Sequence, residues 1–338
     1  MSAEPPPGSD APRYRVFGVT LASSFDFETP LRRTDLPADV AFTCSLEPPW
    51  EMVAADDGAV FESRGRLPGG EPLLALYRGR GSDLLRYSEV ADFYLTDHRI
   101  HCHLLDPTYG FMVEIHLLGL VFSYWFERQG IPMLHASAVA VDGRAAVFIA
   151  TNRGGKSSLA CTLMGAGHPL LSDDVVGLQV TERGPEGRPG FPSMRLWPDQ
   201  AAHFHGEWEG LGLAHPRYEK RRVPIGEGGF GTFRDAPAPL AAFYLPERRP
   251  VAEAPEVDLT TVSPGEAVIE LVRGSFLPRL AQESGLARER MALFGRLAAS
   301  VPMKRLVYPE GNEYLPAVGE AIVADVLRSA PGVYGSAP

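Results

Sequence analysis

The chain has 338 residues, of which 45% are hydrophobic and 22% are charged, and its formal net charge is −10. This length predicts about two domains with a sizeable core, and the composition is typical of a soluble globular protein. The acidic balance argues against a nucleic-acid binder, which normally presents a basic face, so we expect no nucleic-acid partner.

The first residues and the cysteines bear on the compartment. Residues 1–13 have no basic segment followed by an apolar run, so they predict a disordered tail and not a signal peptide. Three cysteines, Cys44, Cys102 and Cys161, give no disulfide framework and favour a reducing compartment. The apolar run IHLLGLVFSYWF, at 115–126, is too short to span a bilayer and predicts a buried helix. We therefore expect a cytoplasmic protein that does not bind membranes.

The first third of the chain has the pattern of short strands. Residues 14–110 alternate apolar runs with turn signals, as in YRVFGVTLAS, PLLALYRG and ADFYLTDHRIHCHLL. This spacing predicts a β-rich N-terminal region. Residues 111–129 then predict a helix, with which a second domain over 111–330 begins.

The second domain begins with an α/β pattern. Residues 134–150 predict two strands joined by Asp142-Gly143, a strong hairpin signal. Residues 156–167 predict a helix that glycines end, and residues 168–180 predict one strand parallel to the strand before that helix. Further strands are expected at SMRLW and LAAFYL, and helices at 263–277 and 284–300.

The segment ATNRGGKS, at 150–157, fits the phosphate-loop pattern G-x-x-x-x-G-K-[ST] except at Ala150. In that pattern backbone N–H groups cradle phosphates, the lysine reaches the outer phosphates and the hydroxyl binds Mg²⁺. The alternative is a Gly-rich turn with a solvated lysine, although a lysine at a helix N-terminus opposes the helix dipole. The residues expected to bind nucleotide are Ala150, Thr151, Asn152, Arg153, Gly154, Gly155, Lys156, Ser157 and Ser158.

Three further residues are candidates for the same site. A two-residue turn pairs Val141 with Arg144, and the same register places His135 opposite Ala150. A right-handed crossover brings the end of the next strand, with Asp173 and Asp174, to the sheet edge that carries the loop. One carboxylate can anchor Mg²⁺ and the other can take a proton. The alternatives are a core histidine and an acidic strand end in solvent.

Two later segments leave their roles open. Asp199 either completes a metal shell or caps a helix, while the neighbouring Trp197 and Pro198 are expected to pack. Residues 220–222, Lys-Arg-Arg, either clamp phosphate or an acidic substrate, or form a solvated charge run.

Residues 132–176 as a whole resemble the catalytic core of HPr serine kinase/phosphorylases, and more closely the related proteins of peptide natural-product clusters, including those for lasso peptides. The shared motifs are LHAS, the Gly-Lys-Ser loop, GH and SDD, and the intervals are 21 residues from His135 to Lys156 and 18 from Lys156 to Asp174. The resemblance implies an α/β P-loop kinase core of the HPr kinase/phosphoenolpyruvate carboxykinase type at 131–180, preceded by a smaller β-rich region.

The same resemblance implies roles for the candidate residues. ATP and Mg²⁺ are the implied cofactors, Lys156 the phosphate lysine and Asp174 the general base, with His135 as its active-site partner. Ser157, Asp173 and Asp199 are then the candidate metal ligands. The chain departs from its relatives at Asn152-Arg153, where they carry Ser-Gly, and at RLWPDQA, where the bifunctional enzymes carry a signature around RGLGI.

We therefore expect an ATP- and Mg²⁺-dependent kinase that phosphorylates a hydroxyl, most simply a serine, of a peptide or small protein, in the maturation of a ribosomal peptide. Two alternatives stay open: a non-catalytic nucleotide-binding module and a small-molecule kinase. Association into a homo-oligomer also stays open. If residue 153 has a positive φ, a non-glycine residue there costs about 1 kcal/mol.

Overall fold

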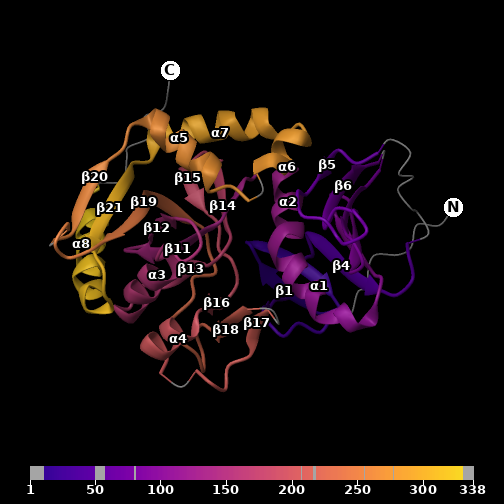
Figure 1. The fold of residues 1–338 in the computed structure, drawn as a ribbon, viewed down its shortest axis with the longest axis horizontal. Helices are drawn as coiled ribbons and strands as arrows, with labels where there is room; N and C mark the ends of the chain where they lie inside the picture. The colour runs from indigo at the N-terminus through magenta and orange to yellow at the C-terminus, as the bar shows by residue number, and fades with distance from the viewer. Residues whose placement is uncertain are drawn as a thin grey trace. The chain divides into compact units, whose positions relative to one another are not determined.

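The structure, a computed structural model, describes residues 11–49, 58–79, 81–206, 208–215, 218–254, 256–276 and 278–329. The chain divides into two compact units (Figure 1), an N-terminal unit of Met1–Gly130 with Leu277–Arg288 and a C-terminal unit of Ile131–Phe276 with Glu289–Pro338. The fold is mixed α/β with several sheets. Of the tail predicted at 1–13, residues 1–10 lie outside the described residues, and Arg13 already belongs to the first strand.

The N-terminal unit holds a nine-stranded sheet in the order β3-β1-β2-β4-β9-β8-β7-β6-β5. Most neighbours are antiparallel, whereas β4 runs parallel to both β2 and β9. The strands are β1 (Arg13–Val16), β2 (Val19–Ser23), β3 (Arg32–Arg33), β4 (Val40–Ser45), β5 (Phe61–Glu62), β6 (Leu74–Arg78), β7 (Asp83–Tyr87), β8 (Ala91–Leu95) and β9 (Arg99–Leu104).

The apolar segment after this sheet is helical with a kink at Gly119, and it belongs to the N-terminal unit. It comprises η1 (Pro107–Tyr109), α1 (Gly110–His116), the π-helical η2 (Leu117–Val121) and α2 (Phe122–Glu127). At 21 residues the segment is by length and composition long and apolar enough to cross a bilayer, whereas the apolar run at 115–126 alone is too short. The aromatic side chains of α2 are nevertheless buried, with Phe122 and Phe126 packed on Phe17 at 5.8 and 6.0 Å between ring centroids.

The unit boundary therefore differs from the one expected at residue 110. The Tyr124 hydroxyl donates a hydrogen bond to Asp83 at 2.6 Å, and the Trp125 indole donates to the carbonyl of Thr96, so the helix is tied to the sheet that precedes it. A later helix, α6 (Pro278–Glu283), also belongs to this unit, and its Arg279 lies 5.5 Å over the ring of Phe61.

The C-terminal unit is built on the order β10-β14-β15-β19-β12-β11-β13, with β21 beside β19 and β20 beside β21. Its helices cover both faces of this sheet. The strands are β10 (Met133–Leu134), β11 (Ala136–Val141), β12 (Arg144–Ile149), β13 (Leu170–Ser172), β14 (Val176–Thr181), β15 (Gly184–Gly187), β19 (Ala238–Arg249), β20 (Asp258–Thr261) and β21 (Met303–Pro309). The helices are α3 (Lys156–Gly165), α5 (Pro264–Arg273), α7 (Ala287–Ser300), η3 (Asn312–Tyr314) and α8 (Leu315–Arg328).

The hairpin β11–β12 has the register predicted from its turn. Pairing runs from Val141 with Arg144 to Ala136 with Ile149. Asp142 and Gly143 both have positive φ, 48° and 76°, as the two central residues of a type I′ turn require. His135 lies one residue before the ladder, so the hairpin delivers it to the end of the sheet at which β12 also ends.

The strand predicted at 168–180 is two strands, β13 and β14, separated by a bend at the acidic pair. β13 pairs antiparallel with β11, so it runs in the same direction as β12, but β11 lies between them. The parallel neighbour of β12 is instead β19. Despite this correction, the carboxyl ends of β12 and β13 emerge at the same edge of the sheet.

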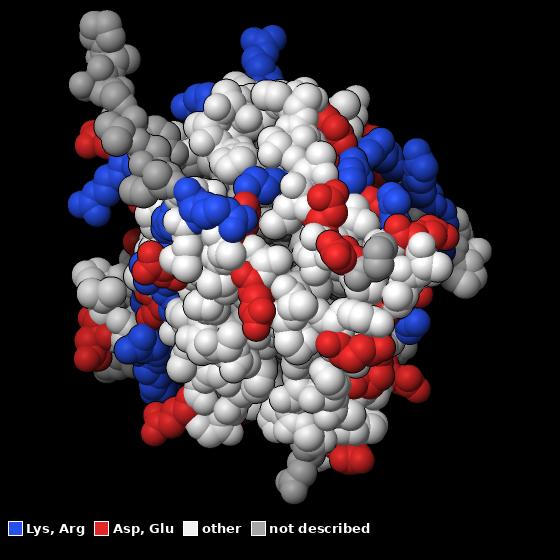
Figure 2. Space-filling model, turned by 90° about the vertical axis from the view of Figure 1, so that its left-hand side faces the viewer, with Lys and Arg blue, Asp and Glu red and all other residues white. Residues whose placement is uncertain are grey.

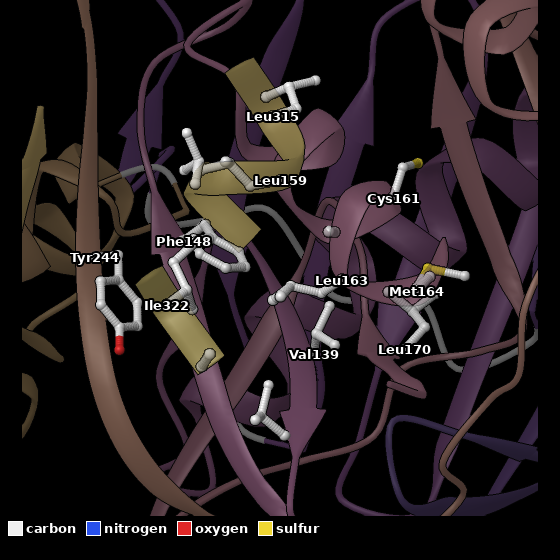
Figure 3. Packing of buried hydrophobic residues seen from close by; sticks show 14 of the residues in the cluster. Val139, Phe148, Leu159, Cys161, Leu163, Met164, Leu170, Tyr244, Leu315 and Ile322 are labelled. Carbon is white, nitrogen blue, oxygen red and sulfur yellow. The ribbon is translucent and has the colours of Figure 1, made fainter. Parts of the chain in front are cut away.

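Two apolar clusters hold the helices of the C-terminal unit against its sheet. In the first, Leu159 and Leu163 of α3 gather with Leu315 and Ile322 of α8 beside Phe148 and Tyr244 (Figure 3). The second cluster lies under α5 and α7 and contains Ala267, Leu271, Phe294 and Leu297. A small sheet, β16 (Ser193–Leu196), β18 (Tyr218–Pro224) and β17 (Leu213–His215), adjoins α4 (Pro198–Phe204) and carries further residues of the site.

Candidate active site

The loop between β12 and α3 needs its two glycines. A Cβ on Gly154 would lie 2.6 Å from the Cβ of Ala150, and one on Gly155 would lie 2.7 Å from the hydroxyl oxygen of Tyr308. Gly155 also has a φ of 90°, which L side chains rarely adopt. Glycine at these two positions therefore lets the loop pack tightly against Ala150 and Tyr308.

The start of α3 is open to an anion. Backbone N–H groups in the first turn of a helix have no intrahelical acceptor, and no side chain in the described part of the chain caps this end of α3. The helix dipole adds partial positive charge at the same point. Lys156 is the first residue of the helix, and its ammonium group donates to the carbonyls of Ala150 at 2.6 Å and Thr151 at 3.1 Å.

Lys156 is itself nearly buried, with 7% of its surface exposed. Burial lowers the pKa of its ammonium group, while the charges of Asp173 and Asp174 oppose that shift. An anion bound at the loop would favour the charged form further, because opposite charges stabilise each other strongly where water is excluded.

Asp173 is buried directly behind the loop. Its Oδ1 accepts hydrogen bonds from Ser137 at 2.5 Å and from Ser157 at 3.2 Å, and its Oδ2 accepts from the backbone N–H of Arg195 at 3.2 Å. Burial, and next the charge of Asp174, raise the pKa of Asp173. The adjacent Ser157 hydroxyl and Asp173 carboxylate are oxygen donors of the kind that Mg²⁺ prefers, so this pair fits the predicted ion.

Asp174 faces the opposite way, toward the cavity. Its carboxylate lies 3.0 Å from Nη1 of Arg195 and 3.3 Å from Nδ1 of His135. Burial disfavours the ionised form, but Arg195, His135 and two lysines together hold the pKa of Asp174 below its usual value. Its φ of 67° is in the left-handed region, which turns the chain between β13 and β14 and separates the directions of the two carboxylates.

His135 connects Asp174 to the loop. Its Nδ1 lies 3.0 Å from the carbonyl oxygen of Asp174, and its Nε2 lies 3.3 Å from the side-chain oxygen of Asn152. The predicted hairpin register therefore does bring this imidazole beside the loop, and both ring nitrogens have a partner there.

A cavity of about 400 Å³ joins these groups. Ala150, Thr151 and Asp173 lie behind it, where they hold Lys156 and Ser157. The predicted residues that line it are His135, Asn152, Arg153, Gly154, Gly155, Lys156, Ser157, Ser158, Asp174 and Asp199.

Five lining residues, Arg195, Leu196, Trp197, Gln200 and Arg248, were not among the predicted ligands. Arg195 and Trp197 lie at the end of the predicted strand SMRLW, and that position could have indicated them. Arg248 has no comparable local signal, because it reaches the loop from the far end of β19. Its guanidinium donates a hydrogen bond to the carbonyl of Arg153.

Of the later candidates, Asp199 and Lys220 line the cavity. Asp199 lies in the first turn of α4 on the cavity rim, and its carboxylate accepts a hydrogen bond from Gln200 at 3.2 Å. No three His, Cys, Asp or Glu side chains among the described residues are close enough to hold a metal alone. Of the Lys-Arg-Arg run only Lys220 lines the cavity, since Arg221 lies 5.2 Å over Trp208 and donates to the carbonyl of Leu211.

Comparison with known proteins gives little beyond this geometry. No family model and no curated protein matches the chain. Among solved structures, the Hpr(Ser) kinase/phosphatase from Coxiella burnetii is similar over 60% of this chain and 99% of that chain, with a TM-score of 0.31 and 13% identity. A likeness of this size does not extend to activity.

Proposed function

We propose that the C-terminal unit is an ATP- and Mg²⁺-dependent kinase that acts in the cytoplasm and transfers the γ-phosphoryl group to a serine hydroxyl of a peptide or small protein. Maturation of a ribosomal peptide is the setting we favour. One observation carries the proposal: Asp173 bonds to Ser157 of the phosphate loop while its neighbour Asp174 faces the cavity that Lys156 lines. Two carboxylates with separate surroundings support two separate roles.

The phosphate chain would be bound by the loop and the start of α3. Lys156 and the open N–H groups of the first turn supply the positive charge that phosphoryl transfer needs, because its catalysis depends mainly on positioning and charge neutralisation. Ser157 and Asp173 would hold Mg²⁺, which neutralises charge on the phosphate oxygens when bound.

Asp174 would accept the proton of the acceptor hydroxyl. As the serine oxygen bonds to the γ-phosphorus, the bond from that phosphorus to the β-phosphate oxygen breaks and the serine proton passes to Asp174. The lowered pKa of Asp174 keeps the carboxylate ionised at neutral pH and therefore able to accept a proton. His135 fixes its orientation through the contacts at 3.0 and 3.3 Å.

One observation favours a second candidate, a nucleotide-binding module without catalysis. The ion pair of Asp174 with Arg195 stabilises the carboxylate and thereby weakens it as a base. Transfer therefore requires the acceptor to compete with Arg195 for this group.

A transfer assay separates the candidates. The full chain is incubated with γ-labelled ATP, Mg²⁺ and a library of serine-containing peptides, beside Lys156→Ala as the inactive variant. We expect label on a peptide with the wild type only, while circular dichroism and melting temperature show that the variant is folded. Binding of ATP without transfer to any acceptor would support the module, and transfer only to small hydroxyl compounds would support a small-molecule kinase.

A further inference from the structure

The rim of the cavity carries two cationic side chains over one aromatic ring. The guanidinium carbon of Arg153 lies 4.2 Å from the ring centroid of Trp197, and Nζ of Lys220 lies 5.6 Å from it. Arg153 comes from the phosphate loop and Lys220 from β18, and both line the cavity beside Lys156. Elements far apart in the sequence thus direct two cations to one indole.

The indole has a fixed position. Trp197 precedes Pro198, and its φ of −67° and ψ of 153° are the extended values that a following proline favours. Pro198 begins α4, and the residue before Trp197, Leu196, is buried in the core at the end of β16. Trp197 is therefore held between a buried strand end and a helix start.

The main chain of Arg153 is fixed as well. Its φ of 61° places it in the left-handed region, and its carbonyl accepts the hydrogen bond from Arg248. The side chain alone would be free in solvent, because the loop at 151–153 is exposed. The face of an indole attracts cations, so Trp197 orders this side chain and offsets the repulsion between Arg153 and Lys220.

We propose that Trp197 is a positioning residue that holds Arg153 and Lys220 as a clamp for the phosphate chain of the nucleotide. The inference rests on the proposed nucleotide binding and deepens it. Side chains ordered before binding lose less conformational freedom when a ligand arrives, so affinity rises without a new contact. The clamp recognises phosphate charge and not the base, and inorganic tripolyphosphate therefore shares it with ATP.

The chain offers a matched control for this pair. Arg221 lies over Trp208 at 5.2 Å in the same unit, and neither residue lines the cavity. Trp197→Leu removes the aromatic face at the cavity, Trp197→Phe keeps an aromatic face there, and Trp208→Leu removes an aromatic face elsewhere. Circular dichroism and melting temperature identify any variant that is not folded.

Calorimetric titration of the full chain with MgATP and with tripolyphosphate tests the clamp. We expect Trp197→Leu to weaken both ligands by about tenfold, because two cationic side chains must then be ordered when the ligand binds. Trp197→Phe should retain most of the affinity, and Trp208→Leu all of it. The dependence of affinity on salt concentration should also weaken in Trp197→Leu.

Three results would overturn the inference. If Trp197→Leu weakens ATP but leaves tripolyphosphate unchanged, the ring binds the base. If it changes neither while the wild type binds both, Trp197 positions nothing, and the proposed nucleotide binding stands. If the wild type binds neither ligand, the clamp and the proposed function fail together.

Discussion

Arg153 occupies a backbone position that normally selects glycine. A φ of 61° costs a non-glycine residue about 1 kcal/mol. The contact of its guanidinium with Trp197 contributes about 0.5–2 kcal/mol in the opposite direction. The two effects are of similar size, so the loop can keep its arginine without a large loss of stability.

Arg153→Gly tests this balance. We expect the free energy of unfolding to change by less than about 1 kcal/mol, because relief of the backbone strain is offset by the lost ring contact and by the greater freedom of glycine in the unfolded chain. ATP affinity should fall, since one cation leaves the cavity. Chemical denaturation and ATP titration measure the two quantities. A several-fold rise in affinity would instead show that the arginine hinders the loop.

We expect substitutions of the two neighbouring aspartates to change different properties of the enzyme, namely its transfer rate and its Mg²⁺ requirement. Asp174→Asn should lower the rate of phosphoryl transfer by about 10²–10⁴-fold, as loss of a general base does, with ATP affinity nearly unchanged. Asp173→Asn should instead raise the Mg²⁺ concentration needed for activity, because Asp173 bonds to the hydroxyl of Ser157. Single-turnover rates and Mg²⁺ titrations separate them. The opposite pattern would exchange the two roles.

At the scale of elements, local signals predicted the centre of the site. The Asp142-Gly143 turn gave the correct hairpin register, and the Gly-Lys-Ser pattern gave the start of α3. The position of β11 between β12 and β13 was not predicted, because helix-linked strands need not be neighbours. Arg248 was missed because only the long-range pairing of β19 with β12 brings it to the loop, whereas Arg195 lies at the end of a strand that was predicted.

The stability of the chain should depend on the buried side chains of the helical segment 107–127. Phe122 is fully buried on Phe17, whereas Phe111, in the same helix, is 45% exposed. Phe122→Ala should therefore lower the free energy of unfolding by about 3–5 kcal/mol, and Phe111→Ala should change it little. Urea unfolding followed by tryptophan fluorescence measures both. Equal, small effects would show that Phe122 faces lipid or solvent.

At the scale of the molecule, the charge of the cavity opposes the charge of the chain. The net charge is −10, yet five cationic residues line the cavity beside the carboxylates of Asp174 and Asp199: Arg153, Lys156, Arg195, Lys220 and Arg248. On one face of the molecule acidic and basic side chains are interspersed (Figure 2). We therefore expect the proposed ligand, ATP, to meet long-range repulsion from the acidic exterior and short-range attraction in the cavity.

Salt should separate these two effects. Raising the ionic strength from about 0.01 to about 0.1 M shortens the screening length from about 30 to about 10 Å, which weakens distant repulsion more than contact attraction. ATP affinity should then hold or rise. From about 0.1 to about 1 M the length falls to about 3 Å, and affinity should drop as the contacts themselves are screened. Lys220→Gln should flatten this second phase, and adenosine, which has no phosphate, should show neither phase. A steady fall in ATP affinity from the lowest salt concentration would show that the acidic exterior has no effect on binding. Salt would then screen only the attraction between ATP and the cations of the cavity.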